Sequence, residues 1–215
     1  MNMIENFSEK SCAAFSEALA SSAPVPGGGG AAALAGALAA ALCAMAGRLT
    51  ASKPAFADRA AELNSLIARA DTLRLSLLRL IDADAEGFVP LSKAYAIPRD
   101  EPGRAETLRQ ATLAACKAPA EMMEALAGCT ALLETLLQHC SRLMLSDVGC
   151  AAALCAGALE AAAMNVFVNT KSLKGDTEAD TVALRTSRLL DDCLPRARAV
   201  SRQVLSLLRE EGENG

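Results

Sequence analysis

Apolar residues recur at steps of three and four along almost the whole chain, and no window alternates apolar and polar residues over a useful length. Steps of three and four place apolar side chains on one face of an α-helix, whereas a half-buried strand alternates apolar and polar residues. Apolar residues make up 52% of the 215 residues, which excludes a disordered chain and is enough for a hydrophobic core. We therefore expect one all-α domain over residues 1–215, an antiparallel bundle of six or seven helices.

Proline and glycine residues divide the chain into these helices. The two prolines and four glycines of PVPGGGG, residues 24–30, cannot lie inside a helix. Pro54 fits a helix start and Pro98 a helix end, and Pro90 should kink or interrupt the last turn between them. The predicted helices span residues 7–21, 54–95, 104–116, 119–145, 147–171 and 177–209. One more predicted helix begins after the glycines and ends at about residue 50.

The charge balance argues against two classes of protein. The 21 Lys and Arg against 25 Asp and Glu give a net charge of −4, whereas nucleic-acid-binding proteins usually carry a basic field. Glu5, Glu9 and Lys10 interrupt the apolar stretch that a secretion signal would need. We expect no nucleic-acid partner and a cytoplasmic location.

Two apolar runs, residues 31–46 and 150–168, raise the question of membrane insertion. Both are rich in alanine, which contributes little to insertion, and the second contains Glu160 and Asn165, which are costly in lipid. A helix that is apolar on all sides can equally be the central helix of a soluble bundle. We therefore expect no membrane contact.

The cysteines and the only histidine form no metal-binding motif. The eight cysteines are irregularly spaced without a C-x-x-C pair, and most fall in apolar helical runs, where a reduced cysteine behaves as a small hydrophobic residue. Reduced thiols are typical of the cytoplasm. His139 could act as a general base or be incidental, but a single histidine cannot build a histidine metal site. No bound metal is expected.

The apolar stripe of the helix predicted at 54–95 contains an acid. Asp84 occupies a position where the pattern requires a core residue, and Asp82 lies about 200° around the helix from it. Burying a carboxylate costs several kcal/mol, so Asp84 is either paired, for instance as a cap on a neighbouring helix, or retained for chemistry. The stripe consists of Leu63, Leu66, Ala70, Leu73, Leu77, Leu80, Asp84, Phe88, Leu91 and Tyr95.

Three further segments could contribute to a site. The glycines end at a helix N-terminus, where free backbone amides attract anions, and four in a row suggest a ligand or another backbone close by; a purely structural turn is the alternative. Asn165 and Asn169 share one helix face, so they could bind a ligand or hydrogen-bond across a helix interface. Ser146 and Asp147 precede the apolar helix, where they could cap it or take part in catalysis.

Three segments in this order carry a resemblance: PVPGGGG before an alanine-rich helix, LIDADAEGF, and SDVGCAAALCAGALEAAAMNVFVNTKSLK. Together they resemble the cyclodeaminase family, which comprises the C-terminal domain of formiminotransferase-cyclodeaminase and its stand-alone bacterial relatives. The resemblance implies an all-α homodimer that acts on a small-molecule folate without a further cofactor. It implies cyclisation of 5-formimino-tetrahydrofolate to the 5,10-methenyl form with loss of ammonia. The alternatives are hydrolysis of the methenyl form to 10-formyl-tetrahydrofolate, or a non-catalytic helical dimer that binds folate or a protein.

The resemblance also implies roles for individual residues. Asp84, if buried, would have a raised pKa and could move the proton of N10 or of the departing ammonia, and Asp147 would stabilise the cationic carbon. Lys53 would face the glutamate tail of the folate. The residues expected to bind substrate are Pro26, Gly27, Gly28, Gly29, Lys53, Asp82, Ser146, Asn165 and Asn169, with the two asparagines at the pterin edge.

The sequence departs from the family pattern at three places. Gly30 replaces a usual serine after the glycines. Only Lys53 remains of three lysines that usually follow the second helix. Cys and Ser at 140–141 stand where the family usually has Gly-Asn.

Overall fold

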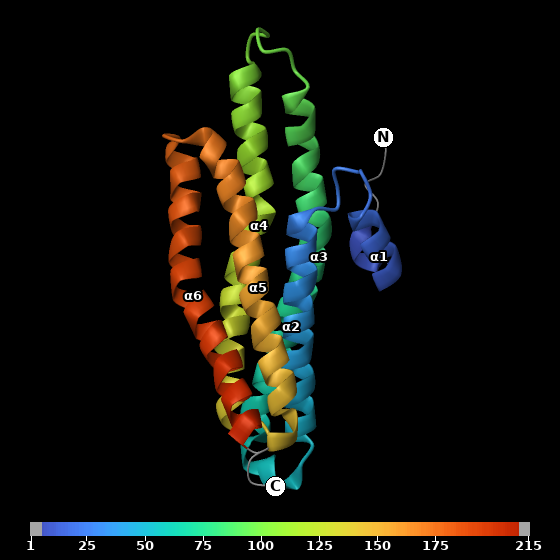
Figure 1. The fold of residues 1–215 in the computed structure, drawn as a ribbon, viewed down its shortest axis with the longest axis vertical. Helices are drawn as coiled ribbons and strands as arrows, with labels where there is room; N and C mark the ends of the chain where they lie inside the picture. Colours follow the sequence, from blue (N-terminus) through green and yellow to red (C-terminus); the bar gives the residue numbers. More distant parts are fainter. Residues whose placement is uncertain (1–5, 211–215) are drawn as a thin grey trace.

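Five long helices and one short helix account for most of residues 6–210, the part of the chain that the computed structural model describes (Figure 1). No strand occurs in this part of the chain, so the all-α prediction is confirmed. The helices are α1 (Cys12–Leu19), α2 (Gly28–Ala51), α3 (Ala60–Tyr95), α4 (Arg104–His139), α5 (Leu145–Thr170) and α6 (Thr177–Glu210). A 3₁₀ turn, η1 (Phe7–Glu9), precedes α1, and three more lie between long helices: η2 (Pro54–Arg59), η3 (Arg142–Met144) and η4 (Lys171–Leu173).

The five long helices run alternately up and down the bundle (Figure 1). α2 packs against α3 and α5, and α5 packs in turn against α4 and α6. α3 and α4 form a long hairpin whose tip projects beyond the other helices, and α1 lies beside the bundle at the level where α2 begins (Figure 1). The start of α2 and the end of α5 therefore meet against the side of the projecting hairpin.

Small residues bring the central helices close together. The buried residues of α2 are mostly alanine and glycine, which present little side-chain volume to their neighbours. A Cβ atom added to Gly36 would lie 2.8 Å from Leu126 on α4, and one added to Gly149 would lie 2.7 Å from Val204 on α6. Since real Cβ contacts are longer than 3.0 Å, a larger residue at either crossing would force a neighbour to move: the end of the Leu126 side chain at Gly36, and the branched Val204 at Gly149.

Several predicted boundaries were wrong. The glycines were predicted to lie outside a helix, but Gly28, Gly29 and Gly30 form the first turn of α2. Residues 104–139 form one helix that continues through the buried Pro119, where two shorter helices were predicted. α3 also continues through Pro90 to Tyr95, so the interruption that was one of the two effects predicted for Pro90 does not occur. A proline inside a helix costs about 3 kcal/mol, and packing along the length of the bundle compensates for that cost. The predicted helix 7–21 is also divided, because Ser11 ends the first turn and caps α1 by accepting a hydrogen bond from the Ala14 amide at 3.2 Å.

Two segments are long and apolar enough to cross a membrane: α2 and Arg142–Leu173, which includes α5. Of their most apolar windows, 61% and 50% are buried inside the bundle. Central helices of a soluble bundle have the same length and composition. Each of these two helices therefore has one side in the core and one side facing outward.

Candidate functional site

A cavity of about 220 Å³ lies where the first turn of α2 meets α3, α4 and α5. It combines a glycine-rich backbone, one carboxylate and two carboxamides with apolar walls. Six of the predicted site residues line it, namely Gly27, Gly28, Gly29, Asp84, Asn165 and Asn169. The other lining residues are Pro24, Val25, Phe88, Ala115, Pro119 and Val168.

The Asp84 carboxylate lies directly against the first turn of α2. A Cβ atom added to Gly29 would overlap the Asp84 carboxyl group, well under the 3.0 Å limit for real Cβ contacts. The backbone N–H of Gly30 donates a hydrogen bond to the same carboxyl group. Gly29 is therefore needed for a close approach between α2 and an acid of α3. Asp84 also accepts a hydrogen bond from the first turn of α2, so it caps a helix, as one of the two interpretations predicted.

Burial gives this carboxyl group an unusual acidity. Removal from water raises the pKa of Asp84 from 3.8 to about 6, and the hydrogen bond from Gly30 partly opposes that change. An acid with a pKa near 6 is mostly ionised at pH 7, yet its conjugate acid forms readily. The group can therefore both accept and return a proton at neutral pH, as a general acid–base catalyst must.

The two carboxamides of α5 line the opposite wall. Asn165 donates from Nδ2 to the backbone oxygen of Ala161 at 2.8 Å, which leaves Oδ1 to accept a hydrogen bond. The Asn165 side chain lies close to the first turn of α2. A Cβ atom added to Gly28 would be 3.5 Å from it, which is an ordinary van der Waals contact. Asn169, one turn later, lines the same cavity. The pair presents polar atoms at the edge of the space next to Asp84.

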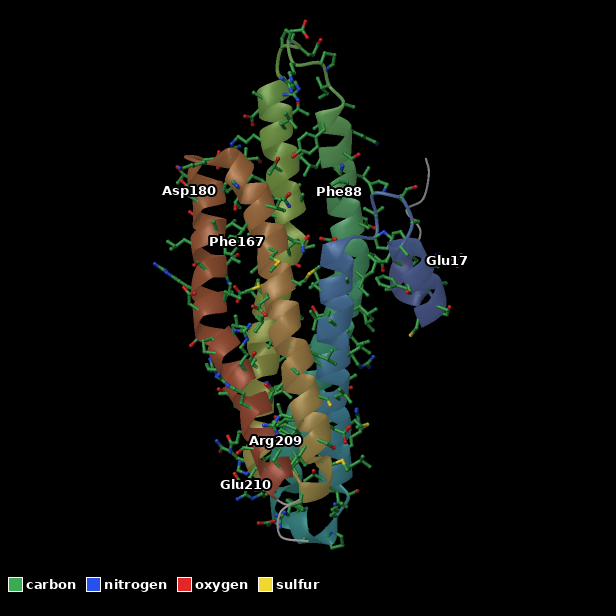
Figure 2. The ribbon with its side chains drawn as sticks, in the orientation of Figure 1. Glu17, Phe88, Phe167, Asp180, Arg209 and Glu210 are labelled. Atoms are coloured by element: carbon green, nitrogen blue, oxygen red, sulfur yellow. The ribbon has the colours of Figure 1, made fainter. Side chains whose placement is uncertain are left out.

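Sequence reasoning missed the apolar walls. Phe88, labelled on α3 in Figure 2, follows Asp84 by one helical turn, and its position in the same stripe could have identified it. Pro119 of α4 and Val168 of α5 also line the cavity. Their sequence context carries no such signal, because their place depends on how three helices pack.

Asp82 has a different partner. Its Oδ1 accepts hydrogen bonds from the backbone N–H groups of Phe7 at 2.7 Å and Ser8 at 3.2 Å. The two acids of α3 thus point apart, as the helical period predicts. Asp82 attaches the N-terminal turn to α3 and does not line the cavity.

We expect Asp82→Ala to lower the free energy of unfolding by about 1–2 kcal/mol, because two backbone donors lose a charged acceptor. The N-terminal turn should also become easier to cleave. Urea denaturation and limited proteolysis at residues before α1 measure the two effects. Asp58→Ala, which removes an exposed acid in η2, is the control and should change neither. Equal behaviour of the two variants would contradict the anchoring role.

The remaining predicted residues lie elsewhere. Pro26 is buried beneath the glycines, next to Gly30. At the opposite end of the bundle, Lys53 donates from Nζ to the Ser141 hydroxyl at 2.9 Å. Ser146 is exposed and Asp147 half-buried, both in the first turn of α5.

Ser146 and Asp147 do not cap α5, so the capping interpretation was wrong. The helix already begins at Leu145, directly after η3, so its N-cap residue is Met144, which makes no side-chain capping hydrogen bond. Asp147 precedes Asn165 by eighteen residues of one helix, or about 27 Å at 1.5 Å per residue. Within one chain the predicted residues therefore form two groups at opposite ends of the bundle, and Asp147 cannot reach the cavity that contains Asp84.

Two other features do not qualify as the site. A larger groove of about 520 Å³ between α4 and α6 includes Lys117, Glu124 and Arg185 but none of the predicted site residues. Its Glu124 and Arg185 are paired with each other at 2.6 Å. His139 contacts Arg59 and lies 3.7 Å from Glu62, at the end of α4 away from the cavity. Among the described residues that line the cavity, Asp84 is the only one with an ionisable side chain.

Comparison with known proteins supports one family. The formiminotransferase-cyclodeaminase family profile matches residues 11–188. The chain is 32% identical over 203 residues to a methenyltetrahydrofolate cyclohydrolase of Methylorubrum extorquens, covering 92% of this chain and 95% of that protein. It is 31% identical over 180 residues to the formimidoyltransferase-cyclodeaminase of Mus musculus, covering 81% of this chain and 33% of the mouse protein.

The fold has a counterpart among solved structures. A crystal structure of formiminotetrahydrofolate cyclodeaminase from Thermotoga maritima matches with a TM-score of 0.80 at 24% identity. The match covers 92% of this chain and 98% of that chain. Since the family profile spans most of the chain and a relative above 30% identity matches nearly its full length, the chain belongs to the formiminotransferase-cyclodeaminase family.

Proposed function

We propose that this protein is an enzyme of folate one-carbon metabolism that converts 5-formimino-tetrahydrofolate into 5,10-methenyl-tetrahydrofolate and ammonia. The observation that carries the proposal is the Asp84 carboxyl group, whose pKa of about 6 arises from burial against the first turn of α2. The names of the relatives support folate chemistry of this kind.

In the proposed reaction, Asp84 accepts one proton from the substrate and later returns it to the leaving group. N10 attacks the carbon of the protonated formimino group on N5, whose C=N electron pair moves to the nitrogen to give an amino group, and the N10–C bond forms while the ionised Asp84 carboxylate accepts the N10 proton. The protonated carboxyl group then returns the proton to the amino group as the C–N bond breaks, and ammonia leaves with the bonding electron pair. A carboxyl group with a pKa near 6 suits both halves of this exchange.

The cavity offers matching contacts for the pterin. Asn165 has a free carboxamide oxygen for a ring N–H, and Asn169 adds a second polar group one turn away. Phe88 and Val168 provide apolar walls of the kind that hold a flat heteroaromatic ring. The backbone of Gly27 to Gly29 allows the ring to approach closely.

Hydrolysis of the methenyl form is the second candidate. The Methylorubrum extorquens relative favours it, because that protein is named a cyclohydrolase and the match with this chain covers 95% of its length. The same carboxylate would accept a proton from water as the water oxygen bonds to the methenyl carbon. Return of that proton to N5 as the N5–C bond breaks, with loss of the hydroxyl proton to solvent as the C=O bond forms, would give 10-formyl-tetrahydrofolate.

The proposal extends to the setting of the enzyme. We propose a homodimer that needs no cofactor and works in the cytoplasm. The eight cysteines are all free, which suits a reducing compartment.

Absorbance of the methenyl-folate chromophore tests the function. If the protein is a cyclodeaminase, the signal grows from 5-formimino-tetrahydrofolate faster than without protein. If it is a cyclohydrolase, the signal from methenyl-tetrahydrofolate decays faster than without protein. Folded wild-type protein that accelerates neither reaction would overturn the enzymatic proposal and favour a binding function.

We expect kcat/KM to rise with pH and to level off above about pH 6. Asp84 must be ionised to accept the first proton, so the rate should fall about tenfold per unit well below its pKa. Initial rates between pH 5 and 8 measure this dependence. Circular dichroism at each pH controls for unfolding. A profile that is flat across this range would exclude Asp84 as the base.

A further inference from the structure

The groove between α4 and α6 shares no lining residue with the cavity that contains Asp84. Its volume is about 520 Å³, and cavities that bind small molecules usually measure about 300–1,000 Å³. Apolar side chains make up much of its lining, namely Leu113, Cys116 and Ala120 of α4 and Val182 and Leu189 of α6. The groove therefore has the size and the walls of a site for a small, largely apolar ligand.

Ion pairs between the two helices mark both ends of this groove. Glu178, the first α6 residue of the lining, lies 3.4 Å from Arg109 of α4. Glu124, the last α4 residue of the lining, lies 2.6 Å from Arg185 of α6. The two pairs link α4 and α6 at two levels, and the apolar surface between these levels stays open as the groove.

One buried polar side chain of the groove makes no hydrogen bond. Of the five buried threonines among the described residues, Thr50, Thr112, Thr130 and Thr170 donate to the backbone oxygen four residues earlier. Thr186 is only 2% exposed, yet its hydroxyl bonds to no other described residue. A buried hydroxyl without a partner is unfavourable, so this group requires an explanation.

The Thr186 hydroxyl faces the groove. Within the described part of the chain, every buried side-chain nitrogen or oxygen that is sealed from solvent has a hydrogen-bond partner. The unpartnered hydroxyl of Thr186 is therefore not sealed, and the groove is the space that this residue lines. A polar atom of a ligand in the groove would supply the missing hydrogen bond.

The charged side chains of the groove leave one cation and one anion for a ligand. Three of its five charged lining residues belong to the ion pairs at its ends. The other two, Lys117 and Glu121, form no ion pair with each other or with any other described residue. They lie one turn apart on α4, on the same side of the helix. An ammonium and a carboxylate side by side are complementary to a ligand that carries both opposite charges.

We propose that this groove is a second ligand site and that it binds an apolar α-amino acid. The carboxylate of the ligand pairs with Lys117, its ammonium group pairs with Glu121, and its apolar side chain lies against the walls of the groove. The Thr186 hydroxyl donates a hydrogen bond to the ligand. A fatty acid or an apolar amine would satisfy only one of the two charges.

A comparison of ligands tests this chemistry. L-leucine, L-methionine, L-phenylalanine and L-tryptophan are titrated separately into the labelled wild-type protein, followed by ¹H–¹⁵N NMR. At least one of them should cause saturable shifts centred on the groove residues of α4 and α6. Glycine lacks the apolar side chain, 3-phenylpropionate the ammonium group and 2-phenylethylamine the carboxylate, so each should bind at least about tenfold more weakly.

Three outcomes of this comparison would overturn the proposal. The first is that none of the four amino acids binds at up to about 10 mM, in which case the Thr186 hydroxyl faces only water. The second is that the shifts centre on another part of the chain. The third is that 3-phenylpropionate or 2-phenylethylamine binds as tightly as the best amino acid, because one of the two charges would then be irrelevant.

Substitutions in the groove test the residues. Thr186→Val keeps the shape of the side chain but removes the hydroxyl, and it should weaken binding about fivefold without lowering stability, since the hydroxyl has no partner to lose. Lys117→Gln should weaken binding by a similar factor. The matched controls are Thr181→Val, at an exposed threonine of α6 outside the groove, and Lys93→Gln, at an exposed lysine of α3.

Both control variants should bind the amino acid as the wild type does. Wild-type affinity in Thr186→Val or in Lys117→Gln, or an equal loss in a variant and its control, would overturn the site. None of these measurements involves turnover of a folate. A protein that binds the amino acid but turns over neither folate substrate contradicts the proposed function alone, and the reverse result contradicts this site alone.

Discussion

Gly29→Ala should lower the free energy of unfolding by about 3 kcal/mol and reduce turnover at least about 100-fold. The added methyl group would overlap the Asp84 carboxyl group, which is held between α2 and α3 and keeps a hydrogen bond to Gly30. The carboxyl group would have to leave its position, and the bundle would have to open around it. Urea denaturation measures the first effect, and initial rates with both folate substrates measure the second.

Gly28→Ala is the control for stability. A Cβ atom added there would lie 3.5 Å from Asn165, an ordinary contact, so stability should stay the same or rise by up to about 1 kcal/mol through the reduced entropy of the unfolded chain. Adding Asp84→Ala to Gly29→Ala removes the overlapping carboxyl group and should restore part of the lost stability. Purely additive effects of these two substitutions would show that the predicted overlap does not occur.

Asp84→Asn should reduce turnover by a factor of about 10²–10⁴ while making the protein more stable above pH 6. The carboxamide has nearly the same shape but can neither accept nor return the proton. Its stability follows from the raised pKa, because ionising the buried carboxyl group costs free energy that the unfolded chain does not incur. Initial rates and urea denaturation at two pH values measure the two effects.

The sign and the pH range follow from the two pKa values. The pKa of Asp84 is 3.8 in an ordinary environment and about 6 in the fold, so the unfolded chain loses its proton first. Stability of the wild type therefore falls as pH rises from about 4 to about 6, by at most about 3 kcal/mol. The variant should match the wild type near pH 4 and exceed it by about 1–3 kcal/mol at pH 8.

Asp58→Asn is the control for this stability difference. Asp58 is exposed in η2, so its replacement should leave the wild-type dependence of stability on pH unchanged. If Asp84→Asn were also no more stable than the wild type at pH 8, the carboxyl group would not be destabilised by burial. Loss of turnover alone would then show only that the side chain is needed.

The helices and the buried acid could be predicted because both depend on local regularity. The period of three and four residues places side chains on one face of a helix whatever the neighbours are, and it placed Asp84 inward and Asp82 outward. Pro119 could not be interpreted in this way. Its local preference is to end a helix, and only the packing of α4 among four other helices compensates for that preference.

The composition of the site depended on more than local sequence. The sequence indicated that glycines, asparagines and acids belong to one kind of site, but it could not show which ends of the helices meet. That depends on the antiparallel packing of α2, α3 and α5, which brings Gly29, Asp84 and Asn165 together.

By itself the sequence determined the helical class and the inward acid, because these depend on spacing along one chain. It also determined the family, through the resemblance of three segments and the profile match over residues 11–188. Only the tertiary structure decided that Asp84 lies against the N-terminal turn of α2, with its pKa raised by burial. It also decided that Asp147 lies at the far end of the bundle, since a straight helix of eighteen residues keeps two groups about 27 Å apart.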